Sequence, residues 1–144
     1  MHVIEILEQK GRDVVSLPSS ETIEGAARVL ADRKIGAVLV LDGGQIVGIV
    51  SERDLIRSVR DGGPFTAPVT TIMSTSLRTC SPDDELRTVA ERMTEERIRH
   101  LPVLEDGELV GIISIGDVVK ARLEDLEHER DHLVSYVHGT PPGS

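Results

Sequence analysis

Two short runs of this sequence hold the residues best suited to bind a ligand. The run GIVSERD spans residues 48–54, and the run GIISIGD spans residues 111–117, 63 positions later. Each run places a serine three residues before an aspartate, so that a hydroxyl and a carboxylate share the first turn of a helix. A glycine stands three residues before each serine and lets another backbone or a ligand come close. The runs therefore indicate a pair of polar sites at the ends of apolar strands.

The same residues also have a purely structural interpretation. Ser51 with Asp54, and Ser114 with Asp117, both fit the pattern of a capping box, in which the two side chains satisfy free N–H groups at a helix start. Such a cap is worth about 1 kcal/mol. The carboxylate would also favour the positive end of the helix dipole. Capping and ligand binding are compatible, because the serine can cap while the aspartate faces a ligand.

The repetition extends well beyond these runs. Residues 35–57 overlay residues 98–120 at the same shift of 63, with nine of 23 positions identical. Upstream of each copy, apolar residues recur at a helical spacing, which predicts amphipathic helices over about 22–34 and 85–97. Each repeat is expected to run strand, helix, strand, strand, helix, with first strands near 14–17 and 77–80. The segments DGGQ and EDGE suit tight hairpins.

These two units resemble a pair of cystathionine-β-synthase (CBS) domains, known as a Bateman module. The motif of that family, Gly-hydrophobic-x-Ser/Thr-x-x-Asp, matches at Gly48, Ser51 and Asp54. It matches again at Gly111, Ser114 and Asp117. The resemblance covers about residues 3–122. It implies a mixed α/β (α+β) fold, in which tandem β-α-β-β-α repeats pack about a pseudo-twofold axis.

The expected organisation follows from the repeats. We expect a first repeat with an N-terminal helix over 1–60, a connector over 61–76 and a second repeat over 77–124. A C-terminal helix extension is expected over 125–138 and a disordered tail over 139–144. The apolar stripe of the extension has near coiled-coil spacing, which predicts packing on another chain or on the N-terminal helix. A homodimer, common in the family, fits this stripe.

The resemblance also implies a ligand, since the family binds adenosine-containing molecules in the clefts between repeats. AMP is the first candidate, with ATP, ADP and NAD next, and no other cofactor is expected. Asp54 and Asp117 would accept hydrogen bonds from ribose hydroxyls, with Ser51 and Ser114 holding the ribose or phosphate end. Backbone around Ser16 and Thr79 would read the adenine.

The two repeats differ where a phosphate would bind. Arg53 lies in the first motif, whereas Gly116 stands at the matched position of the second. Arg99 and His100 precede a strand of the second repeat, where the first has the small residues Gly36 and Ala37. The arginines also fit exposed surface positions, and His100 fits a half-buried residue bonded to backbone. We expect one working nucleotide site more readily than two, without ranking them.

Composition limits the other function classes. The net charge of −9 disfavours nucleic acid, and the aromatic content of 1% leaves few side chains for base stacking. No apolar run is long enough to span a membrane, and the single cysteine excludes an intrachain disulfide. A cytoplasmic protein that is not an enzyme is the simplest expectation. It would act as an energy or redox sensor on a separate, unknown partner. The alternative is a scaffolding dimer that works by protein contacts without a nucleotide.

Three weaker patterns have simpler interpretations than a functional site. The run around Ser114 does not have the G-x-S-x-G spacing of a hydrolase nucleophile. His128 and His132 lie one helical turn apart and could pair on a metal, although a solvated helix face is the simpler interpretation. Cys80 fits a core position better than a reactive thiol.

Overall fold

The computed structural model describes residues 1–137, and these divide into two compact units. The first-repeat unit is Asp13–Arg78. The second-repeat unit combines Met1–Arg12 with the chain from Thr79 onward. Residues 138–144, which include the expected tail and the last residue of the expected helix extension, lie outside the described part.

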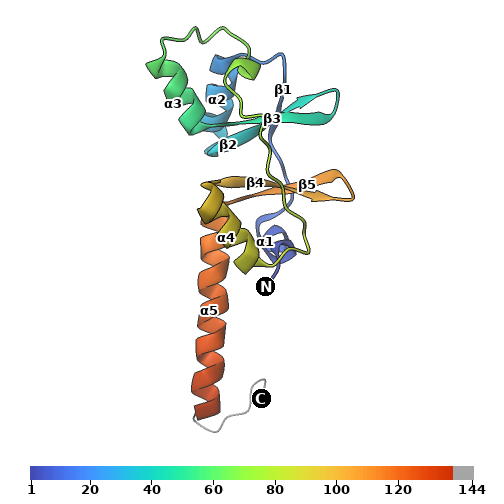
Figure 1. The fold of residues 1–144 in the computed structure, drawn as a ribbon, viewed down its shortest axis with the longest axis vertical. Helices are drawn as coiled ribbons and strands as arrows, with labels where there is room; N and C mark the ends of the chain where they lie inside the picture. The colour runs from blue at the N-terminus through green and yellow to red at the C-terminus, as the bar shows by residue number, and fades with distance from the viewer. Residues whose placement is uncertain (138–144) are drawn as a thin grey trace. The chain divides into compact units, whose positions relative to one another are not determined.

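The first-repeat unit contains a three-stranded sheet of order β1-β2-β3 (Figure 1). β1 is parallel to β2, and β3 is antiparallel to β2. This matches the expected strand, helix, strand, strand, helix order. The elements are β1 (Ser16–Pro18), α2 (Ile23–Arg33), β2 (Ala37–Asp42), β3 (Gln45–Ser51), α3 (Glu52–Arg60) and the 3₁₀ turn η1 (Val69–Thr71).

The second-repeat unit contains a two-stranded antiparallel sheet, β4-β5. The strand expected near 77–80 is reduced to a single parallel bridge between Cys80 and Val103. Where the Leu39 N–H donates to the Val15 carbonyl in the first repeat, the second repeat has Pro102, which has no N–H to donate, so the matching strand bond cannot form. The elements are α1 (Val3–Lys10), α4 (Leu86–Glu96), β4 (His100–Glu105), β5 (Glu108–Ser114) and α5 (Ile115–Val137).

The two hairpins have the same register and confirm the expected turns. Gly43 and Gly44 both have positive φ, at 56° and 81°, and so do Asp106 and Gly107, at 51° and 80°. Two successive positive φ values define the type I′ turn that suits a two-residue hairpin. Each hairpin also shifts register at the matched place, between Val40 and Leu41 in one, and between residues 103 and 104 in the other.

The segment before each repeat packs in the unit of the other repeat. We call residues 1–10 the N-terminal arm and residues 67–76 the connector arm. In the second-repeat unit, the Val3 N–H donates to the Asp84 carbonyl at 3.0 Å. In the first-repeat unit, the Val69 N–H donates to the Glu21 carbonyl at 2.8 Å. Residues 21 and 84 occupy matched positions of the repeats, so the arms dock on equivalent places.

This arrangement differs from the expected grouping, in which the N-terminal helix belonged with the first repeat. Its physical cause is apolar burial, since Val3, Ile6 and Leu7 join a core cluster with Leu86 and Ile113 of the second repeat. The connector likewise does not run free, because Val69 is fully buried in the core of the first-repeat unit. The repeat boundary in sequence is therefore not the boundary of packing.

The two motif glycines are where the arms come closest to the sheets. A Cβ placed on Gly111 would lie 2.6 Å from Leu7 Cδ2. A Cβ placed on Gly48 would strike the Met73 side chain and lie 3.0 Å from the Ser74 carbonyl oxygen. The expected close approach is thus made by the protein's own arms. Gly48 and Gly111 have a packing role that does not require a ligand.

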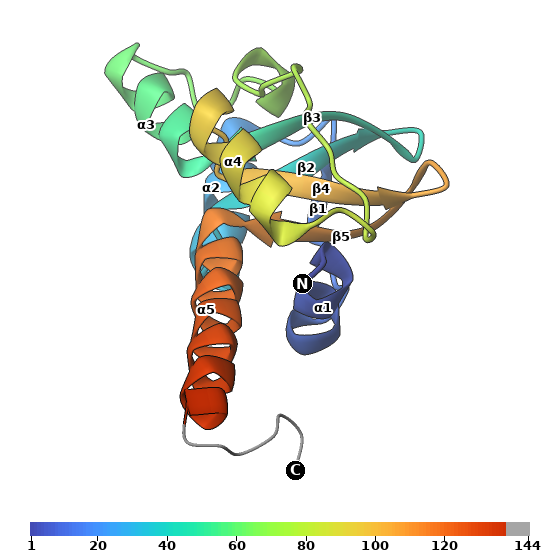
Figure 2. The same ribbon diagram turned by 60° about the horizontal axis from the view of Figure 1, so that its bottom comes forward.

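The long helix α5 contacts its unit only near its start. Val118 and Ala121 are buried beside Ile6 of α1, and the two helices lie side by side in both views (Figure 2). Beyond that point the helix continues past the sheet, and its apolar residues are exposed. These residues are Leu123, Leu126, Leu133 and Val134. The expected contact with the N-terminal helix is therefore limited to the first turns of α5.

Candidate functional site

The first motif is built where β3 passes directly into α3. The Ser51 N–H donates to Asp54 Oδ2 at 2.9 Å, and the Ser51 hydroxyl donates to the same oxygen at 3.1 Å. Both arms of a capping box are present here, as the sequence pattern predicts. Asp54 Oδ1 has a looser neighbour, the Arg57 guanidinium at 4.0 Å. One carboxylate oxygen is thus committed to the helix cap, and the other keeps capacity to accept hydrogen bonds.

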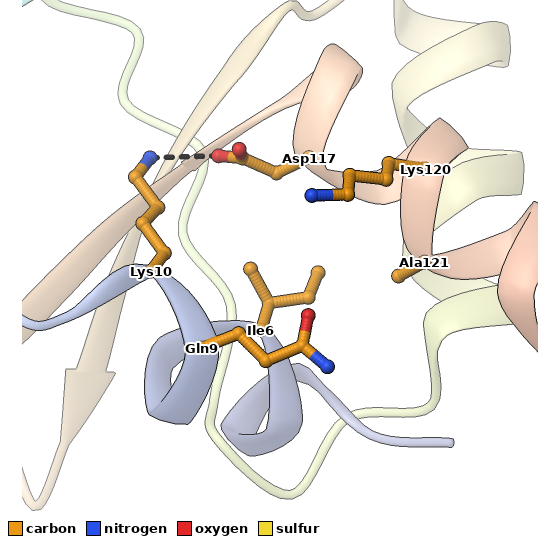
Figure 3. A pocket seen from close by; sticks show the side chains of 6 residues that line it. All are labelled: Ile6, Gln9, Lys10, Asp117, Lys120 and Ala121. Atoms are coloured by element: carbon orange, nitrogen blue, oxygen red, sulfur yellow. Dashed lines mark hydrogen bonds and ion pairs between the residues drawn. The ribbon is translucent and has the colours of Figure 1, made fainter.

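The second motif repeats the cap at the passage from β5 to α5. The Ser114 N–H donates to Asp117 Oδ2 at 2.9 Å, and the Asp117 N–H donates to the Ser114 hydroxyl at 3.1 Å. Here a further group is added, because Lys10 Nζ from the N-terminal arm lies 2.7 Å from Asp117 Oδ2 (Figure 3). The same ammonium donates to the Ile112 carbonyl at 2.9 Å. Asp117 is therefore paired closely with a cation from an arm, whereas the cation nearest to Asp54 is Arg57 of its own helix at 4.0 Å.

The ion pair changes the acidity of Asp117. Burial alone would raise the pKa of this carboxyl, but hydrogen bonds from Lys10 and Ser114 and the charge of Lys10 outweigh burial. The net result is a pKa below the usual range of an aspartate. The carboxylate is consequently held in its charged form by contacts that the folded protein makes for itself.

The starts of β2 and β4 lie beside these motifs, so four predicted residues lie where they were expected. These residues are Gly36, Ala37, Arg99 and His100. Ala37 is paired with Ser51, and His100 is paired with Ser114. The Glu52 N–H at the start of α3 donates to the Gly36 carbonyl at 3.1 Å. At the start of α5, the Ile115 N–H donates to the Arg99 carbonyl at 2.8 Å. Each unit thus brings a strand start, a strand end and a helix start together.

The remaining predicted residues lie around these clusters at different places in the fold. Arg53 is exposed on the first turn of α3, next to Asp54. Ser16 is exposed on β1, where it pairs with Leu39. The Thr79 carbonyl already accepts a hydrogen bond from the Arg92 guanidinium at 3.1 Å. That bond uses part of the acceptor capacity that was expected to read an adenine in the second-repeat unit.

Sequence reasoning missed Lys10. It belongs to no motif, and the helix that carries it was expected to belong to the first repeat. A second omission concerns Ser81 and Asp84, where the Ser81 N–H donates to Asp84 Oδ2 at 2.9 Å. This pair copies the motif bond without the preceding strand and glycine. The bond geometry alone is therefore a structural device, and any ligand role must rest on its surroundings.

In the described part of the chain, the structure gives Cys80, His128 and His132 no arrangement typical of a reactive or metal-binding site. Burial, reinforced by the charge of Asp84 and opposed by Arg92, raises the pKa of the Cys80 thiol to about 12. A buried thiol with so high a pKa is a poor nucleophile. His128 and His132 are exposed on α5, and no group of three or more metal-ligating side chains occurs among residues 1–137. In the same residues, no helix is both long and apolar enough to span a membrane.

The chain belongs to the CBS domain family. The family model matches residues 3–61 and 69–124, which is most of the chain and includes much of both arms. The CBS domain-containing protein YhcV of Bacillus subtilis is 31% identical over 106 residues, covering 73% of this chain and 76% of YhcV. These matches establish the two repeats inferred from the 63-residue shift.

Solved structures agree with the fold. The CBS-domain containing protein ATU1752 from Agrobacterium tumefaciens superposes with a TM-score of 0.82 at 43% identity, covering 85% of this chain and 99% of that protein. PAE2072 from Pyrobaculum aerophilum, a CBS domain protein complexed with AMP, superposes with a TM-score of 0.74 at 33% identity. That match covers 81% of this chain and 89% of PAE2072. The chain is thus a CBS pair, and such pairs are generally regulatory modules.

Proposed function

We propose that this chain is a regulatory module that binds an adenine nucleotide at the Ser51–Asp54 motif. The observation that carries the proposal is the arrangement of the Asp54 carboxylate. Its side chain is only 14% exposed, one oxygen is held by the helix cap, and the other lies 4.0 Å from the Arg57 guanidinium. A carboxylate has about four acceptor positions, so two remain for a pair of neighbouring hydroxyls. The cis-hydroxyls of a ribose are such a pair.

The surroundings of Asp54 suit the rest of a nucleotide. The N-terminal N–H groups of α3 and the exposed Arg53 provide positive charge for a phosphate. Gly36 and Ala37 beside the motif are small residues, where the second repeat has Arg99 and His100. AMP is the first candidate, with ATP, ADP and NAD next. The cationic sulfonium of S-adenosylmethionine fits less well beside Arg53. The similarity to PAE2072, which is complexed with AMP, supports the same choice.

The proposed role is that of an energy or redox sensor. The module, with no catalytic activity of its own, would change the behaviour of a separate protein according to which nucleotide it holds. The exposed apolar residues of α5 support a homodimer, because a second copy would cover them. A cytoplasmic location stays a prediction. The alternative is a scaffolding dimer that acts by protein contacts, and it is favoured by the same stripe on α5.

A thermal-shift panel separates the two functions. Wild-type protein is melted with AMP, ADP, ATP, NAD and S-adenosylmethionine. A ligand present at about 100 times its dissociation constant stabilises the folded state by about 2.7 kcal/mol. We expect the largest shift with AMP, and a much smaller one in Asp54→Asn, where the amide oxygen can still accept the capping bond from Ser51. Asp61→Asn, an exposed carboxylate of the same unit, is the control. If none of the five ligands changes the melting temperature, only the scaffolding function remains.

A further inference from the structure

The second motif differs from the first because its carboxylate is paired closely with a cation from outside its own helix, whereas Asp54 has only the looser 4.0 Å pair with Arg57. Lys10 Nζ contacts Asp117 Oδ2 at 2.7 Å and the Ile112 carbonyl at 2.9 Å. Two of the three N–H donors of the ammonium are therefore used within the protein. Both acceptors belong to the second-repeat unit, so Lys10 is held in place by the unit in which its own helix packs. The contact is a built feature of this unit and not a chance surface pairing.

The surroundings of the pair form a small cavity between the end of α1 and the start of α5. It has a volume of about 100 Å³ and is drawn in Figure 3. Ile6 and Ala121 provide buried apolar wall, while Lys120 adds a second ammonium on the α5 side. The side chains lining it are Ile6, Gln9, Lys10, Asp117, Lys120 and Ala121. In this setting the negative charge of Asp117 is already matched, which lowers its value as an acceptor for a neutral hydroxyl.

The first-repeat unit has no counterpart to Lys10 on its own arm. The connector arm docks on that unit as the N-terminal arm docks on the other, with Met73 beside Gly48 where Leu7 lies beside Gly111. Residues 67–76 contain no lysine, arginine, aspartate or glutamate. The connector arm therefore cannot place a cation on Asp54. The arms therefore add a difference between the two motifs to the one in the repeats themselves, where Arg53 is matched by Gly116.

We propose that Lys10 is a built-in occupant of the second motif, which shares Asp117 Oδ2 with the helix cap and matches the charge of the carboxylate, so that a nucleotide binds first at Asp54 and binds at Asp117 only in competition with Lys10. Lys10 is in this sense a specificity-determining residue that makes the two sites unequal. The inference rests on the proposed function, because it assumes that these motifs take a ribose. The pair is partly exposed, with side chains 36% and 26% accessible, so solvent weakens it. We accordingly expect a penalty of up to about fivefold in affinity, which corresponds to about 1 kcal/mol.

The opposite role for Lys10 would be a direct contact with the nucleotide phosphate. The geometry favours occupancy, because only one donor of the ammonium is left for a third group. The two roles predict opposite signs. An occupant weakens binding at the second site, so its removal tightens AMP. A phosphate contact strengthens binding, so its removal weakens AMP.

The test isolates the second site in an Asp54→Asn background and titrates AMP calorimetrically. We expect Asp54→Asn alone to bind weakly, and Asp54→Asn with Lys10→Met to bind up to about fivefold more tightly. Adding Asp117→Asn should then abolish the gain. Lys120→Met is the matched control, since it removes the other ammonium of the cavity and should give no gain. Lys10→Gln is a second variant in case Lys10→Met folds poorly.

The outcomes separate the two proposals. If wild-type protein binds AMP through Asp54 but Lys10→Met brings no gain or a loss, Lys10 is not an occupant and only this inference fails. If neither wild-type protein nor any Lys10 variant binds AMP, the proposed function is wrong for this nucleotide, and the inference about Lys10 is then wrong as well. Equal gains from Lys10→Met and Lys120→Met would also overturn the inference, because a general charge effect would then be responsible for both.

Discussion

The packing of Leu7 against Gly111 predicts a strong energetic coupling between the N-terminal arm and the second repeat. In Gly111→Ala, the new Cβ would lie 2.6 Å from Leu7 Cδ2, whereas ordinary contacts begin at 3.4 Å. Leu7 would have to withdraw by about 0.8 Å, the difference between those distances, and its side chain is only 1% exposed within a packed core. Overpacking of this kind costs about 1–3 kcal/mol.

The coupling is measured by a double-mutant cycle. Leu7→Ala alone removes a buried side chain and is expected to cost about 2–5 kcal/mol. In the double variant, the methyl group introduced at position 111 enters the space that Leu7 vacates, so the second substitution should add almost nothing. The coupling energy would then equal most of the cost of Gly111→Ala, about 1–3 kcal/mol. Additive costs would refute the contact and, with it, the assignment of the N-terminal arm to the second-repeat unit.

The assay can be confined to the relevant unit, because Cys80 belongs to it and is the only cysteine. The rate of thiol labelling in increasing urea reports the opening of the second-repeat unit, while circular dichroism reports the whole chain. Gly116→Ala is the control. Its nearest neighbour would be Ser114 Oγ at 3.6 Å, an ordinary contact, so it should stabilise the protein by about 0.4–1 kcal/mol.

Three further outcomes are expected. The pKa of the Cys80 thiol is raised to about 12 in the folded protein, against about 8.5 in the unfolded chain. At pH 8, Cys80 should therefore react with iodoacetamide on the order of a thousandfold more slowly in the folded protein than in the unfolded chain. Comparable rates would mean that the thiol is exposed. Because the folded-state pKa of Asp117 is lowered, its ion pair stabilises the protein above about pH 4, and that stability is lost as the pH falls through the lowered value. Urea unfolding of Lys10→Met should therefore depend less on acid than that of wild type, and identical acid profiles would contradict this. Leu126→Glu should convert the proposed dimer to a monomer in light scattering, whereas an unchanged mass would show that α5 is not the interface.

Local features of the fold could be predicted from the sequence because short-range physics determines them. The glycines of DGGQ dictate a type I′ turn, and the helical spacing around Ala26 and Val89 dictates amphipathic helices. The serine and aspartate of each motif form the expected caps. The repeat identified the family, because two copies of a whole β-α-β-β-α unit are far more specific than a four-residue cap.

The docking of the two arms could not be predicted, because it depends on long-range packing. Nothing in the sequence around Val3 or Val69 states which repeat will bury it, and proximity in sequence pointed to the wrong one for the N-terminal helix. The contact of Lys10 with Asp117 could not be predicted for the same reason, because it depends on α1 packing beside the start of α5. The inequality of the sites was expected from Arg53 and Gly116, and the structure adds a second source of inequality in the arms.

Calorimetric titration of AMP into wild-type, Asp54→Asn and Asp117→Asn proteins shows directly whether Asp54 holds the nucleotide. Losing hydrogen bonds to a charged acceptor costs about 1.5–3 kcal/mol, so Asp54→Asn should weaken the tight site about tenfold to a hundredfold. Asp117→Asn, whose carboxylate is held by Lys10, should leave the tight site unchanged. Wild-type affinity in Asp54→Asn, or loss of the tight site in Asp117→Asn alone, would contradict the assignment of the nucleotide to Asp54.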